Sequence, residues 1–358
     1  MAWKSGLKIK EEIDVNINNK DEKEIQIINM HSLSLLDLAP VEYLIDGILP
    51  AVGLCMIAAP PKYGKSYLVL DLSTCIAQGV PFLGFTTHKA GVLYLALEDS
   101  PNRIKERVMQ VNGGTYPENV NLLFSVDLLE DDLMKGLLEI MKLIPQTKMI
   151  IIDTLQVVRE STKNEASYAS DYKEMRIFKQ FAEKMGICIL LVHHCRKTID
   201  ALDPLNSISG TTGIVGAMDA VIVMYRKKRE SVDTQMFVTG RDVENQTYQL
   251  NFDNGIWKMI GDTNEIEDKK EKENYESNQI ISTIKKCLIS GDGEWRGSMS
   301  DLIGESCRQQ NEIKMTPRKL SEELKNLYPQ LWHFDDISHN IIGNGTGGGK
   351  HVFKQEGN

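Results

Sequence analysis

Several protein classes are excluded by what this 358-residue sequence lacks. Its six cysteines are scattered without a C-x-x-C pair, so neither a disulfide framework nor a zinc site is expected. No apolar run is long enough to cross a bilayer, and the N-terminal residues show no signal-peptide pattern. The net charge of -9 excludes a uniformly basic surface, although local basic patches remain compatible with nucleic-acid binding. We therefore expect a cytoplasmic protein without a membrane partner.

Composition and periodicity divide the chain into four segments. Residues 1–34 are polar and charged, and we expect an N-terminal arm there. Residues 35–260 alternate short apolar runs with amphipathic patterns, which predicts an α/β domain whose mostly parallel sheet is covered on both faces. Residues 261–277 are charged and predict a linker. Residues 278–358 predict three short helices and a glycine-tipped hairpin, which is the order of a winged-helix domain.

The stretch "AAPPKYGKS" at 58–66 lies between a strand pattern and a helical pattern. It lacks the opening glycine of the phosphate loop G-x-x-x-x-G-K-[ST], because Ala59 stands there. It retains Gly64, Lys65 and Ser66, whose types allow the turn, reach the phosphates and ligate Mg²⁺. The predicted nucleotide-binding residues are Pro61, Lys62, Tyr63, Gly64, Lys65, Ser66 and Tyr67.

Polar side chains end three other apolar runs. "MIIID" ends in Asp153, "LYLALED" in Glu98 and Asp99, and "ILLVHH" in His193 and His194. Each has a structural explanation when taken alone, such as a turn aspartate or a helix cap. Parallel strands bind ligands where their carboxyl ends meet, so these groups together predict one site beside the phosphate loop. A metal shared by the two histidines is not expected, since neighbours on a strand point to opposite faces.

Five ordered motifs resemble the RepA-type branch of the RecA-like hexameric ATPases, which includes replicative helicases of plasmids, phages and other mobile elements. The resemblance covers about residues 40–255 and implies a RecA-like P-loop NTPase core that assembles as a ring, with a hexamer expected. The motifs are "APPKYGKSYLVLDL", "GVLYLALEDSPNRIKERV", "IIIDTLQ", "LLVHHCRK" and "SGTTGIVGAMDAVIVM", the last followed by "TGRD".

The resemblance also implies roles for individual residues. Lys65 and Ser66 would bind the phosphates of ATP and Mg²⁺, and Asp153 would be the second carboxylate on the magnesium side. Glu98 would be the catalytic base, and His194 would sense the γ-phosphate.

The same resemblance gives Arg241 in "VTGRD" the role of an arginine finger offered to a neighbouring subunit. Relatives often have a lysine two residues earlier, where this chain has Thr239. Arg226 and Lys227 are therefore alternative donors, and a solvated hairpin arginine is the structural alternative for Arg241.

Two long polar loops correspond to the segments of RecA-like motors that face a central channel and grip single-stranded DNA. They are "VVRESTKNEASYAS" and "RKTIDALDPLNSISGTTGIVG", and loops of this length are typical of functional segments. Their candidate phosphate contacts are Arg159, Lys163, Arg196 and Lys197.

The C-terminal segment could dock either duplex DNA or a replication protein. A winged helix places one helix in the major groove and its wing on the backbone. The candidate basic residues are Arg318, Lys319 and Lys325 on the helix that begins at Thr316, with Lys350 and His351 on the wing. Glu322 and Glu323 share this helix and reduce its basic character, so both kinds of partner stay open. Trp295, Tyr328 and Trp332 are expected in the core.

Three functions remain compatible with the sequence. The first is an ATP-hydrolysing, DNA-translocating ring that acts as a replicative helicase of a mobile element or phage. The second is a non-unwinding ATPase that loads a helicase or acts as a regulatory switch. The third is a DNA-binding module whose ATPase core is degenerate.

Overall fold

The computed structural model describes residues 28–38, 40–125, 133–160, 167–196, 198–226, 233–343 and 349–356. The chain divides into a first unit up to Val41 and a second from Glu42 onward. In the first unit, helix α2 (Met30–Ser34) begins after Asn29, whose side-chain oxygen accepts a hydrogen bond from the Ser32 N–H at 2.8 Å. This short helix lies within the predicted N-terminal arm.

The second unit is built on a nine-stranded sheet with the order β11-β10-β9-β8-β3-β7-β6-β4-β5. The strands from β8 to β5 run parallel, and β9, β10 and β11 continue the sheet as antiparallel hairpins. A short hairpin of β1 and β2 lies outside this sheet. The strands are β1 (Tyr43–Ile45), β2 (Leu49–Pro50), β3 (Gly53–Ala59), β4 (Gly91–Ala96), β5 (Val120–Leu123), β6 (Thr147–Asp153), β7 (Cys188–His194), β8 (Ala220–Tyr225), β9 (Asp233–Gly240), β10 (Gln246–Asp253) and β11 (Ile256–Asp262).

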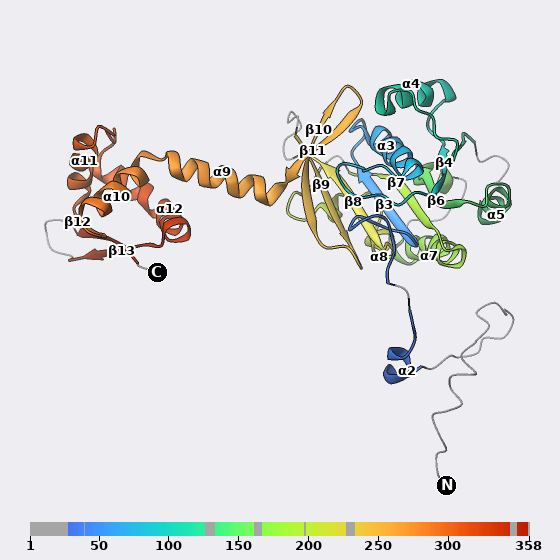
Figure 1. Cartoon of the computed structure of the whole chain (residues 1–358), viewed down its shortest axis with the longest axis horizontal. Coiled ribbons are helices and arrows are strands. Elements are labelled where there is room, and N and C mark those ends of the chain that lie inside the picture. Colours follow the sequence, from blue (N-terminus) through green and yellow to red (C-terminus); the bar gives the residue numbers. More distant parts are fainter. Residues whose placement is uncertain are drawn as a thin grey trace, which may run out of the picture. The chain divides into compact units, whose positions relative to one another are not determined.

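Helices cover both faces of the parallel part of the sheet (Figure 1). In β3 every residue is buried, and alternate side chains enter two different cores. Cys55 and Ile57 pack with α3 and α4, whereas Leu54 and Met56 share the second core with α5 and α7. This two-sided burial explains the continuous apolar runs. The helices are α3 (Lys65–Gln78), α4 (Pro101–Asn112), α5 (Leu133–Leu143), α6 (Leu155–Glu160), α7 (Tyr168–Met185), the 3₁₀ helix η2 (Pro204–Ser207) and α8 (Thr212–Gly216).

The strand order decides which chain segments meet. Strand β6 lies between β4 and β7, and β7 lies between β6 and β3. The carboxyl ends of these four strands therefore form one edge, with the phosphate loop directly after β3. The predicted α/β fold with a mostly parallel sheet is confirmed.

Most of the charged segment 261–277, where the sequence analysis predicted a linker, is the helix α9 (Thr263–Ser277), while residues 261 and 262 end β11. The N-cap of α9 is Asp262, whose carboxylate accepts from the Asn264 N–H at 2.7 Å. At the other end, Tyr275 is buried in the core of the C-terminal part and its hydroxyl donates to Asp335. The helical spacing of an apolar residue near each end was too sparse a signal to identify this helix.

The C-terminal part contains three helices and a three-stranded antiparallel sheet with the order β12-β14-β13. The predicted helices and hairpin are present, together with β12, which the sequence analysis missed. Trp295 and Tyr328 pack against the core as expected, but the expectation for Trp332 is wrong, because its exposed fraction is 55%. The elements are α10 (Gln279–Ser290), β12 (Glu294–Gly297), α11 (Met299–Arg308), α12 (Pro317–Asp335), β13 (Ile337–Ile342) and β14 (Lys350–Gln355). No helix in the described parts of the chain is long and apolar enough to cross a membrane.

Candidate nucleotide site

The phosphate loop turns directly into α3, and its glycine is required by the local geometry. Gly64 has a φ of 73°, a left-handed conformation that favours glycine. A Cβ at this position would lie 3.1 Å from the Trp257 ring. The Trp257 indole N–H donates to the Gly64 carbonyl at 3.1 Å, which ties the loop to the β10–β11 hairpin. The structure therefore explains why a glycine is retained at position 64.

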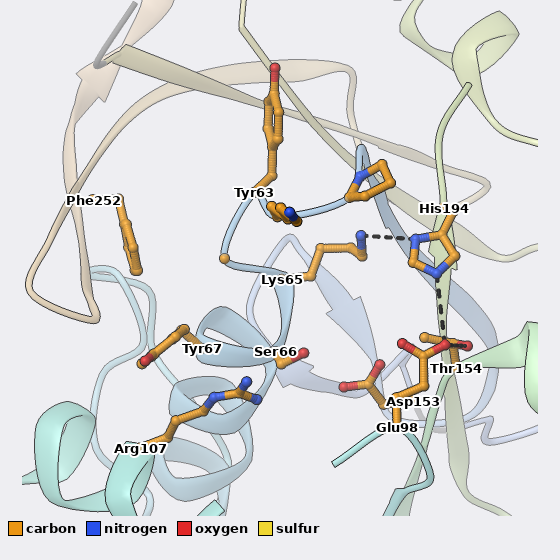
Figure 2. A pocket seen from close by; sticks show the side chains of 13 residues that line it. Tyr63, Lys65, Ser66, Tyr67, Glu98, Arg107, Asp153, Thr154, His194 and Phe252 are labelled. Atoms are coloured by element: carbon orange, nitrogen blue, oxygen red, sulfur yellow. Dashed lines mark hydrogen bonds and ion pairs between the residues drawn. The ribbon is translucent and has the colours of Figure 1, made fainter. Parts of the chain in front are cut away.

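Lys65 lies at the first position of α3 with its ammonium group pulled back toward β3 and β7. Its Nζ donates to the carbonyls of Ala59 at 2.9 Å and Pro60 at 3.2 Å, and it lies 3.2 Å from His194 Nδ1 (Figure 2). Burial lowers the pKa of Lys65, and the nearby carboxylates of Asp153 and Glu98 oppose this effect. The ammonium group is thus held by three acceptors that a phosphate can replace.

His194 connects Lys65 to Glu98. An ammonium group has no acceptor, so a hydrogen bond with Lys65 requires an unprotonated Nδ1 and places the ring proton on Nε2. His194 Nε2 lies 3.8 Å from Glu98 Oε1. Burial, followed by the charge of Lys65, lowers the pKa of His194, which favours the neutral ring. His193 points elsewhere, is buried, and its Nε2 lies 3.0 Å from the Ser209 carbonyl, as expected for neighbours on a strand.

The donor set beside the loop suits a magnesium ion. The Asp153 side chain is buried, and burial raises the pKa of its carboxyl to about 6. The hydroxyls of Tyr94, at 2.8 Å, and Ser66 hydrogen-bond to this carboxylate. A buried carboxylate next to a serine hydroxyl is the hard-oxygen environment that Mg²⁺ prefers. Bound Mg²⁺ would neutralise charge on the β- and γ-phosphates.

A pocket of about 390 Å³ lies over these groups. Its wall includes the predicted residues from Pro61 to Tyr67 together with Glu98, Asp153 and His194. The structure therefore brings together the predicted residues of the cis site, which is the part of the nucleotide site that a single chain supplies. The sequence analysis missed Thr154, Arg107 and Phe252, which also line it.

Arg107 and Phe252 form an aromatic and cationic end of the pocket with Tyr67, whereas Thr154 lies beside Glu98. The Arg107 guanidinium lies 5.0 Å from the centre of the Tyr67 ring, and the Tyr67 and Phe252 rings meet edge to face at 5.5 Å. Asp99 pairs with Arg107, whereas the helix cap of α4 is Ser100. These flat groups can stack on a nucleotide base. Nothing in the sequence around Arg107 indicated that it would line the nucleotide pocket.

Arg241 lies away from the pocket, after β9. Its backbone N–H donates to the Asp219 carbonyl at 2.8 Å, and its Nε lies 3.6 Å from the Asp219 carboxylate. That carboxylate also accepts from the Leu54 N–H at 3.0 Å, at the start of β3. Lys65 follows the opposite end of β3, about 20 Å further along at the rise of a strand. Arg241 is therefore unable to reach Lys65 of the same chain.

The alternative donor Arg226 lies over the Tyr63 ring of its own phosphate loop, with 4.9 Å between guanidinium and ring centre. Lys227 lies outside the described residues. Arg226 is thus placed near the site of its own chain.

The predicted DNA-facing loops are described in part. Arg159 lies in α6 and forms ion pairs with Asp171 and Glu174, which ties it to α7. Arg196 is exposed and donates to the Gly210 carbonyl at 3.0 Å. Lys163 and Lys197 lie outside the described residues. Arg159 is thus engaged within the protein, while Arg196 is presented on the surface.

Comparison with known proteins identifies the domain. The family model described as "AAA domain" matches residues 28–200. Residues 28–200, a little under half of the chain, are thus similar to an AAA domain. The match covers the phosphate loop, Glu98, Asp153 and His194, whereas Phe252, which also lines the pocket, lies beyond it. The mostly parallel sheet with a phosphate loop after β3 is the fold predicted for this core. The match to an AAA domain supports ATP hydrolysis.

The chain is also similar to two solved structures. It matches the ATPase domain of G40P with a TM-score of 0.47 and 13% identity, covering 58% of this chain and 84% of that one. It matches a DnaB-like replicative helicase, studied with its interactions with primase, with a TM-score of 0.46 and 13% identity. The second match covers 57% of this chain and 57% of that one. No curated protein matches the sequence significantly.

Proposed function

We propose that this protein is an ATP-driven motor that moves along single-stranded DNA, and that it acts as a ring-shaped replicative helicase of a mobile element or phage. The observation that carries the proposal is the continuous set of contacts from Lys65 through His194 to Glu98, beside the Ser66–Asp153 pair. A degenerate scaffold has no need for this set, so the third candidate function is disfavoured.

In the proposed reaction, each residue has one task. The γ-phosphate replaces the carbonyls and His194 as the partner of Lys65, whose ammonium group neutralises charge in the transition state. Ser66 and Asp153 hold Mg²⁺, and Glu98 accepts the proton of the attacking water. His194 loses its contact with Lys65 when the phosphate arrives, so its ring can respond to the presence of the γ-phosphate.

The position of Arg241 supports a ring in which subunits complete one another's sites. Because it lies at the far edge of the sheet, it can act as an arginine finger only on a neighbouring subunit. In a head-to-tail ring each subunit would offer this edge to the next nucleotide. We propose a homo-oligomer of this kind, with a hexamer expected.

The loops that follow β6 and β7 are the proposed contacts for single-stranded DNA. Both leave the sheet at the nucleotide edge, so a change around Asp153 or His194 can alter them. Arg196 is the exposed cation that supports this assignment among the described loop residues.

We further propose that residues 278–358 form a winged helix that binds duplex DNA or a replication protein. Arg318, Lys319 and Lys325 are exposed on α12, as major-groove contacts require. Arg318 lies 3.4 Å from Glu322, an arrangement that weakens the basic character of this face and keeps a protein partner open.

The proposal is tested by ATP turnover with and without single-stranded DNA. We expect DNA to stimulate hydrolysis and Lys65→Ala to reduce turnover at least ~100-fold. Lys89→Ala, at an exposed position outside the pocket, is the control that should leave turnover unchanged. Normal turnover in Lys65→Ala would contradict the assigned site.

Strand displacement on a forked DNA substrate separates a helicase from the alternative loader or switch. Unwinding that requires ATP, together with a ring of defined size in the presence of ATP and DNA, supports the motor. DNA-stimulated hydrolysis without unwinding would instead favour the loader or switch.

A further inference from the structure

Thr154 contacts the residue that the proposed function makes the catalytic base. It follows β6 directly, its exposed fraction is 1%, and its hydroxyl donates to Glu98 Oε1 at 2.7 Å. We propose that Thr154 is a positioning residue that holds the Glu98 carboxylate in the orientation needed to activate water. This inference rests on the proposed function, in which Glu98 is the base.

The backbone places Thr154 and Glu98 together rigidly. Strands β4 and β6 pair in parallel with Ala96 opposite Asp153. The Leu97 N–H donates to the Asp153 carbonyl at 2.8 Å, which continues the pairing past the end of β4. The next residues along each strand are Glu98 and Thr154. The Thr154 carbonyl also accepts from the Val157 N–H at 3.2 Å, so the start of α6 fixes the threonine from its other side.

Glu98 needs such a contact because its own side chain is 46% exposed. An exposed glutamate has several free rotations, and only some of them direct the carboxylate into the site. The β-branched side chain of Thr154 is stiff about χ1 and is buried, so its hydroxyl offers a donor in one place. The hydrogen bond selects Oε1, which is also the oxygen near His194 Nε2.

The contact leaves the other carboxylate oxygen for the reaction. Within the described residues, none donates a hydrogen bond to Glu98 Oε2. In the proposed step, a lone pair of Oε2 takes the proton of the attacking water while the water oxygen bonds to the γ-phosphorus and the bond to the leaving ADP oxygen breaks. Thr154 keeps Oε1 occupied and the carboxylate plane fixed during this transfer.

The alternative explanation is purely structural: Glu98 only accepts a hydrogen bond from the hydroxyl of a buried threonine. The two readings differ in what Thr154→Val does. Valine keeps the shape and removes the donor, and the Glu98 oxygen can accept from water because it is half exposed. A structural role therefore predicts normal turnover in this variant, whereas a positioning role predicts slow turnover in a folded protein.

The experiment compares Thr154→Val and Thr154→Ser for kcat, ATP affinity and unfolding temperature. We expect kcat of Thr154→Val to fall roughly 10- to 100-fold, since a displaced base loses its alignment. Its ATP affinity and unfolding temperature should match the wild type, because Glu98 contributes to the chemical step. Serine keeps the hydroxyl, so Thr154→Ser should recover most of the activity.

Normal kcat in Thr154→Val overturns the inference, as does a Thr154→Ser variant that is as slow as Thr154→Val. A second measurement uses Glu98→Gln with and without Thr154→Val. If threonine acts through Glu98, the double variant should be no slower than Glu98→Gln alone. Additive losses overturn the inference.

Glu98→Gln also separates the inference from the proposed function. Loss of turnover in Glu98→Gln with normal turnover in Thr154→Val overturns the role of Thr154 alone. Normal turnover in Glu98→Gln would overturn the proposed base, and the role of Thr154 with it.

Discussion

At the scale of single residues, the site is organised by hydroxyl groups as much as by charged groups. Tyr94 and Ser66 direct the Asp153 carboxylate, and Thr154 directs Glu98. Tyr94 is completely buried in β4, and burial raises the pKa of its hydroxyl well above the ordinary value, so it remains a donor at every working pH. Each hydroxyl limits the orientation of a carboxylate whose charge would otherwise leave it mobile.

Removal of the Tyr94 hydroxyl should weaken the magnesium site. Groups that orient a metal ligand are worth about 10- to 100-fold in metal affinity or activity. We therefore expect Tyr94→Phe to raise the Mg²⁺ concentration for half-maximal ATP turnover by roughly 10-fold, measured by Mg²⁺ titration at saturating ATP. Tyr116→Phe is the matched control, because its hydroxyl contacts the Lys105 carbonyl at an exposed position. An unchanged Mg²⁺ requirement in Tyr94→Phe would show that Ser66 alone orients Asp153.

At the scale of elements, α3 joins the phosphate loop to the core. It begins at Lys65 and ends at Gly79, and its apolar side chains pack under β3 and β4. Asp71 is an exception on this helix, because burial raises the pKa of its carboxyl to about 6 and only the Cys75 thiol donates to it in the described structure. The helix therefore carries a charge that is costly at neutral pH.

The cost of Asp71 should depend on pH. Its folded pKa of about 6 lies above the ordinary value of 3.8, so the folded protein binds this proton more tightly than the unfolded chain. The destabilisation is absent below about pH 4, grows as the pH rises toward 6, and is complete above 6.

We expect Asp71→Asn to raise the free energy of unfolding by about 1–3 kcal/mol at pH 8 and to change it little at pH 4. Chemical denaturation at the two pH values measures this difference. Asp268→Asn, an exposed substitution on α9, should leave stability unchanged at both. An Asp71→Asn variant that is less stable than the wild type at pH 8 would contradict the expectation.

At the scale of the whole molecule, the phosphate-binding residues and the proposed arginine finger lie at opposite ends of the strands of one sheet. Lys65 follows the carboxyl end of β3, and Asp219 holds Arg241 near the amino end. Lys179 from α7 pairs with the same Asp219 carboxylate. One subunit therefore carries the phosphate loop at one end of the strands and Arg241 at the other end, so Arg241 of one copy can meet the phosphate loop of a second copy.

Mixing of two inactive variants tests this arrangement. Lys65→Ala and Arg241→Ala should each lose turnover, since one lacks the phosphate contact and the other the finger. In mixed rings, an intact site forms where an Arg241→Ala subunit receives the finger of a Lys65→Ala neighbour. A 1:1 mixture should recover roughly a quarter of wild-type turnover, because random assembly of head-to-tail interfaces makes about one site in four intact. Absence of recovery would place the finger elsewhere, with Arg226 as the next candidate.

Much of the fold and of the cis site could be predicted because the signals are local. The buried strands are continuous apolar runs, and the turn from β3 into α3 is encoded in Gly64, Lys65 and Ser66. Glu98, Asp153 and His194 were found because a polar residue that ends an apolar run marks a strand end. The helix α9 and strand β12 were missed because neither has a clear apolar pattern of its own.

What the sequence by itself determined is the set of strands, the phosphate loop and the polar residues that follow the strands, since each depends on neighbours along the chain. Only the tertiary structure decided which strand ends lie side by side. The placement of β6 between β4 and β7 brings Thr154 to Glu98 and Tyr94 to Asp153. The pairing of β8 with β3 and β9 places Arg241 at the other end of β3. These contacts join residues that are distant in sequence. They depend on which parallel strands pair, and this pairing has no local signal in the sequence.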